Sequence, residues 1–164
     1  MDELINIFKY KLVWLNILLS VILLILSFYQ TAAAAFLFVV LSNLFDILGY
    51  HFSLIRRSTQ LPEKIIIKSY RINQFLFDLL LLILIGIQFD WVAAICGWIM
   101  KLFGLQDVFY YVFLKASLPQ KWTWMKWTPL GFLKGNLTRW EIVIQAIVGI
   151  LIAITILILK SVYY

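Results

Sequence analysis

Cysteine and histidine each occur once in this chain of 164 residues, as Cys96 and His51. A single cysteine excludes a disulfide within the chain. Together, the two counts exclude a metal site built from several thiolates or imidazoles of one chain. Gly-rich phosphate loops and the HExxH and GxSxG motifs are also missing from the sequence. No motif therefore names a reaction.

Charged residues are also scarce, at 13% of the chain, whereas 64% of the residues are hydrophobic and the mean hydropathy is +0.97. Long apolar runs recur, which is typical of an integral membrane protein. Residues 1–164 are expected to form a single transmembrane domain, because no stretch is left for a separate soluble one. The net charge of +6 does not indicate nucleic-acid binding. The basic residues lie between apolar runs, where they set topology and contact the membrane lipids.

The runs predict an all-α fold, a polytopic helical bundle that is integral to the membrane. We expect about five transmembrane helices, at residues 12–28, 32–55, 74–89, 91–114 and 142–159. Residues 56–73 are predicted to form a basic loop broken by Pro62. Residues 116–137 carry tryptophans beside lysines, which is typical of the headgroup zone, and are predicted to form an interfacial loop.

The first apolar run has a second interpretation. Lys9 and Lys11 precede it and the alanines of residues 32–35 follow it, a pattern that also resembles a secretory signal peptide. The run is longer than a usual signal-peptide core, and the sequence given begins at Met1. We therefore favour a retained helix over a cleaved leader.

The distribution of basic residues predicts the topology. Five spans place the two termini on opposite sides of the membrane. With the N-terminus in the cytoplasm, twelve of the 14 Lys and Arg residues lie on the cytoplasmic side, Lys160 lies outside and Lys101 lies within the membrane. The positive-inside rule favours this orientation. The sequence thus predicts a multi-pass protein of the cell membrane with its N-terminus in and its C-terminus out.

The predicted span 91–114 is unusual because it carries Lys101 and Asp107. On a continuous helix these two residues share one broad side with Gly97 and Gly104, while Ile95 and Phe109 lie opposite. Charges in a membrane helix usually face the bundle interior or a wet cavity. We therefore expect one face to contact lipid and the other to contact neighbouring helices.

Three acidic residues lie inside the predicted spans and are the main site candidates. At about 1.5 Å of rise per residue, Asp46, Asp78 and Asp107 lie roughly 14, 8 and 10 Å from the cytoplasmic ends of their helices, and Lys101 lies nearer the middle. His51 points about 140° away from Asp46, so it is not expected to share a site with it. The predicted catalytic set is Asp46, Asp78, Asp107, Lys101, Tyr50 and Tyr111, with Asn43 nearby.

The chemistry of this set leaves two interpretations open. One lysine cannot neutralise three carboxylates, so the others must be protonated, hydrated or bound to a cation. Asp46, Asp78 and Asp107 are therefore predicted metal ligands for Mg²⁺ or Mn²⁺, which prefer oxygen donors. The alternative is purely structural, with Lys101 paired to Asp46 or Asp107 between helices.

Three functions fit these residues. The first is a membrane-embedded enzyme that acts on a lipid-like substrate from the cytoplasmic leaflet. The second is a proton, cation or small-solute transport subunit, expected to be a homo-oligomer. The third is an accessory subunit of a larger membrane complex. Glu141 is left out of the site because Thr138 and Glu141 have the spacing of a helix capping box.

Overall fold

The computed structural model describes residues 8–9, 11–55 and 63–163, and within these ranges the secondary structure is helical apart from one pair of two-residue strands. The helices are α2 (Lys11–Ser27), α3 (Thr31–Ile55), α4 (Glu63–Gln88), α5 (Trp91–Leu102), α6 (Leu105–Phe113), α7 (Pro129–Lys134) and α8 (Arg139–Tyr163). Strands β1 (Lys121–Trp122) and β2 (Leu137–Thr138) pair antiparallel. The prediction of an all-α bundle is confirmed.

Three helices are long and apolar enough to cross a membrane: α3, α4 and α8. Helices α5 and α6 add a fourth candidate if the bent pair counts as one span, and α2 is a shorter apolar helix of 17 residues. Large apolar side chains are exposed along α2, α4 and α8, as expected for surfaces that contact lipid. Several spanning candidates are thus confirmed, while the number five stays a prediction.

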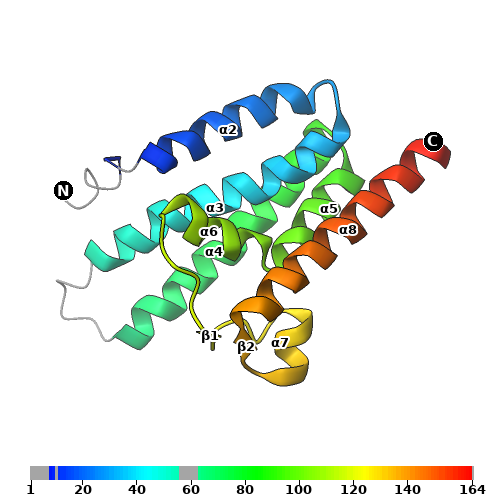
Figure 1. Cartoon of the computed structure of the whole chain (residues 1–164). Coiled ribbons are helices and arrows are strands. Elements are labelled where there is room, and N and C mark those ends of the chain that lie inside the picture. Colours follow the sequence, from blue (N-terminus) through cyan, green and yellow to red (C-terminus); the bar gives the residue numbers. More distant parts are fainter. Residues whose placement is uncertain (1–7, 10, 56–62, 164) are drawn as a thin grey trace.

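Helix α3 lies at the centre of the bundle, between α2, α4, α5 and α6 (Figure 1). Small residues let its neighbours approach closely. A Cβ atom on Gly97 of α5 would lie 2.5 Å from the Phe38 Cβ and 2.7 Å from the Ala35 carbonyl oxygen of α3. Gly97 is therefore required by the contact between these two helices.

Residues 63–73 are helical, so the predicted basic loop 56–73 is wrong over this stretch. Helix α4 begins at Glu63, which places Lys64, Lys68 and Arg71 on its first turns. In the sequence, Pro62 directly precedes the helix, a position where the missing N–H of proline costs nothing. Proline here marks the start of a helix rather than the middle of a loop.

Residues 91–114 do not form one continuous helix, so the prediction that Lys101 and Asp107 share one side of such a helix is wrong. Helices α5 and α6 are bent by 69° at residues 103–104. Gly104 has a φ of 87°, which favours glycine, and a Cβ there would lie 2.5 Å from the Ile142 Cδ1 of α8. Beyond the bend, the residues of α6 no longer lie on the sides that they would occupy if α5 continued as one helix.

Gln145 of α8 satisfies backbone groups at this bend. Its Nε2 donates to the Phe103 carbonyl at 3.1 Å, and its Oε1 accepts from the Leu130 N–H of α7 at 2.8 Å. An unpaired carbonyl in a membrane interior is costly. One buried glutamine thus stabilises the bend and ties it to the segment that contains β1, α7 and β2.

The start of α2 and the end of α8 lie at opposite ends of the bundle (Figure 1). Asp90 caps α5 by accepting from the Ala93 N–H at 2.9 Å, and Lys160 of α8 donates to the same carboxylate. Partial burial alone would raise the pKa of Asp90, but these hydrogen bonds hold it below its usual range. The predicted capping box is confirmed, because the Thr138 N–H donates to Glu141 at 2.8 Å.

Candidate functional site

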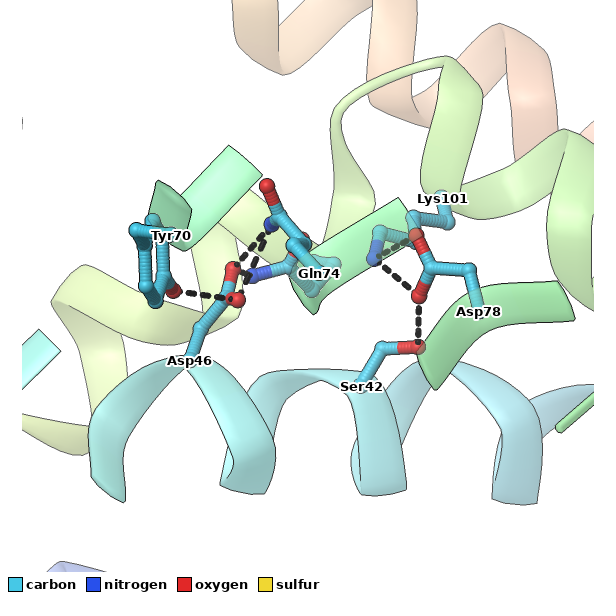
Figure 2. Close-up of polar contacts among 7 residues, drawn as sticks. Ser42, Asp46, Tyr70, Gln74, Asp78 and Lys101 are labelled. Atoms are coloured by element: carbon cyan, nitrogen blue, oxygen red, sulfur yellow. Dashed lines mark hydrogen bonds and ion pairs between the residues drawn. The ribbon is translucent and has the colours of Figure 1, made fainter. Parts of the chain in front are cut away.

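Lys101 of α5 pairs with Asp78 of α4. Its Nζ lies 2.5 and 2.6 Å from the two carboxylate oxygens, and the Ser42 hydroxyl of α3 donates to one of them at 3.2 Å (Figure 2). The side chains of Lys101 and Asp78 are only 11% and 14% exposed. Lys101 is therefore paired with Asp78, and not with Asp46 or Asp107 as the structural alternative predicted.

Asp46 of α3 is buried and accepts hydrogen bonds from three uncharged side chains. The Tyr70 hydroxyl donates to it at 2.6 Å, and the Gln74 Nε2 lies 2.9 Å from both of its oxygens (Figure 2). The Gln106 side chain of α6 also donates to it. These three donors hold the carboxyl group in place without providing a positive charge.

The two carboxyl groups form neighbouring layers of one polar cluster. Ser42 and Asp46 lie one turn apart on α3, and Tyr70, Gln74 and Asp78 follow at the same spacing on α4. Lys101 adds a contact from α5 and Gln106 adds one from α6. The cluster therefore connects all four helices at the level of the bend.

Asp107 lies in the first turn of α6, where the helix dipole favours a negative charge. Its carboxyl group is partly buried and lies near the Trp124 side chain. Asp46, Lys101 and Arg71 are its charged neighbours within electrostatic range. Asp107 thus adjoins the cluster and connects it to the tryptophan-rich segment.

The other predicted site residues have separate positions. The Tyr50 side chain falls outside the described part of the structure. The Tyr111 ring packs edge-on against Trp122, with their centroids 5.2 Å apart. Among the described residues, no group of three or more His, Cys, Asp or Glu side chains could hold a metal ion. The arrangement therefore lends no support to Mg²⁺ or Mn²⁺ at the three aspartates, and the catalytic and metal roles of the set stay predictions.

Four members of the cluster are absent from the predicted site: Ser42, Tyr70, Gln74 and Gln106. The predicted loop 56–73 includes Tyr70, although Tyr70, Gln74 and Asp78 have the spacing of one helical face. Gln106 was overlooked because its neighbour Asp107 carries the charge. A search for uncharged donors at helical spacing would have found Tyr70, whereas Gln106 depends on the bend.

No protein-family model matches the chain, and comparisons with curated proteins and with solved structures find no similar protein. The polar cluster itself is therefore the feature that indicates a function. A carboxyl group held by uncharged donors in a buried setting can take up or release a proton, as a general acid or base must.

Proposed function

We propose that the protein is a membrane-embedded enzyme that acts on a lipid-like substrate, with Asp46 as its general acid or base. The observation that carries this proposal is the difference between the two carboxylates: Lys101 pairs with Asp78, whereas the hydrogen bonds to Asp46 from the described residues all come from uncharged side chains. Ionisable groups inside membrane helices are functional-site candidates.

In this proposal the other residues position Asp46 and the substrate. Tyr70 and Gln106 orient the carboxyl group, and the Lys101–Asp78 pair fixes α5 against α4. Tyr70 and Gln74 are partly exposed on the flank of α4, and Arg71 beside them is exposed. An anionic lipid headgroup would meet this basic residue while its chain lies along the apolar surface of α4.

The proposal also includes five membrane crossings with the N-terminus in the cytoplasm. Support comes from the twelve basic residues that this orientation places inside, and from the opposite positions of the α2 start and the α8 end. The cluster then serves the cytoplasmic leaflet. A reporter fused after Tyr164 should behave as extracytoplasmic, and a cytoplasmic signal from it would contradict this orientation.

The enzyme proposal is tested by comparing the lipids of cells that produce wild-type protein, Asp46→Asn or Asp90→Asn. We expect at least one lipid class to change in abundance with the wild type and with Asp90→Asn, and to remain at its background level with Asp46→Asn. Asp90 is the matched control because its carboxylate lies in the α4–α5 connection and caps α5. Equal lipid profiles for wild type and Asp46→Asn, at equal protein levels in the membrane, would rule out this role.

An accessory subunit is the second candidate function. It is favoured by the way in which the cluster ties four helices together, which a purely structural network would also do. If so, Asp46→Asn would change the recovery of a co-purifying membrane complex rather than any lipid class. The lipid comparison therefore separates the two candidates.

A further inference from the structure

Two asparagine side chains are completely buried. Asn16 of α2 and Asn43 of α3 are each 0% exposed. Among the residues that the structure describes, none provides a hydrogen-bond partner for any of their four side-chain nitrogen and oxygen atoms. A carboxamide that is removed from water needs groups that both donate and accept hydrogen bonds, and the bilayer interior supplies none.

The fold places the two asparagines at the same level of one helical hairpin. Helices α2 and α3 run antiparallel, and Val13 of α2 and Ile47 of α3 belong to one cluster of buried side chains. Towards the connecting residues 28–30, Asn16 lies three positions beyond Val13, and Asn43 lies four positions beyond Ile47. At about 1.5 Å per residue, both are roughly one turn from the same contact.

Helix α6 covers this part of the hairpin. Its Phe113 belongs to the cluster with Val13 and Ile47, and α6 packs against both α2 and α3. Asn43 also precedes Asp46 by three residues, which puts the two side chains about 60° apart on the same side of α3. The asparagines therefore lie in the part of the hairpin that α6 covers, and Asn43 lies about one turn from the candidate acid on α3.

We propose that Asn16 and Asn43 form a binding site for internal water, and that this water is the proton reservoir for Asp46. Water fits the chemistry because a carboxamide pair offers donors and acceptors but no charge, so neither a cation nor an anion is favoured. Bound water also bridges polar groups that do not bond directly. The link to Asp46 rests on the proposed function, whereas the water site itself does not.

The site is tested by hydroxyl-radical footprinting of the full chain in lipid nanodiscs, where radicals formed from bound water label the side chains beside it. Val13 and Val39 are a matched pair, because both are 0% exposed but Val39 belongs to the apolar core. We expect Val13 to be labelled and Val39 to be protected. In the Asn16→Leu/Asn43→Leu double variant, labelling of Val13 should fall to the level of Val39.

Further measurements separate loss of the water site from unfolding of the bundle and from failure of the enzyme proposal. Unchanged circular dichroism of the double variant and continued protection of Val39 show that the bundle is intact. Asp46→Asn should retain the labelling of Val13, so a failed lipid test and a failed water test are distinguishable. Equal protection of Val13 and Val39 in the wild type would overturn the proposal. The proposal would also be overturned if Val13 were protected and a lipid were bound to the wild type but not to the double variant. The site would then hold lipid rather than water.

Discussion

Replacing Lys101 by methionine should lower the free energy of unfolding by about 3–5 kcal/mol, the range for removing one partner of a buried ion pair. The loss is expected to be large because Asp78 would keep a charge that is only 14% exposed, with the Ser42 hydroxyl as its remaining partner. Chemical unfolding of the purified protein in detergent micelles, followed by circular dichroism, measures this difference.

A second substitution shows which carboxylate Lys101 serves. Asp78→Asn in the Lys101→Met chain should recover much of the loss, because the buried pair is then replaced by two uncharged groups. Asp46→Asn in the same background is the matched control and should give no such recovery. If Asp46→Asn rescued the variant and Asp78→Asn did not, the assignment of the cation to Asp78 would be wrong.

The polar positions within apolar helices were the most predictable part of the site. Asp46, Asp78 and Lys101 stand out because charged residues are rare inside long apolar runs, and burial follows from the cost of exposing them to lipid. The sequence could not decide which carboxylate takes the lysine. That choice depends on the relative rotation of α3, α4 and α5, which is set by close packing at positions such as Gly97.

The bend between α5 and α6 could not be predicted from the sequence for a related reason. Residues 91–114 have the hydropathy of one span, and a single glycine is often tolerated within a helix. The bend is stabilised by contacts from α8, where Gln145 satisfies the Phe103 carbonyl and Ile142 packs over Gly104. Tertiary contacts of this kind leave no periodic pattern in the segment that bends.

The charge of the first residues of α4 predicts a loop, whereas their helical spacing predicts the helix that the structure shows. Lysine and arginine suggested a loop, yet long basic side chains fit the end of a membrane helix, where their charged groups can reach the headgroups. The capping box at Thr138 and Glu141 was recovered because it is a local signal, complete within four residues.

The carboxyl group of Asp46 should exchange its proton with the bathing solution. If this carboxyl group is an acid or base, its protonated and ionised forms should interconvert when the pH of the bathing solution changes. The charged and titratable groups around it are Lys101, Asp78, Asp107 and Tyr70. Lys101 is engaged by Asp78, so proton exchange at Asp46 should persist in the presence of the ion pair.

Infrared difference spectroscopy of the protein in lipid bilayers tests this claim most directly, because a protonated carboxyl group has a C=O stretching band that the carboxylate lacks. Spectra recorded at acidic and alkaline pH should differ by such a band in the wild type and in Asp90→Asn. Other carboxyl groups of the chain also take up protons at acidic pH, so the Asp46 contribution is the part of this signal that Asp90→Asn keeps and Asp46→Asn lacks. A wild-type difference spectrum that matches that of Asp46→Asn throughout the pH range of the folded protein would contradict proton exchange at Asp46, and with it the proposed function.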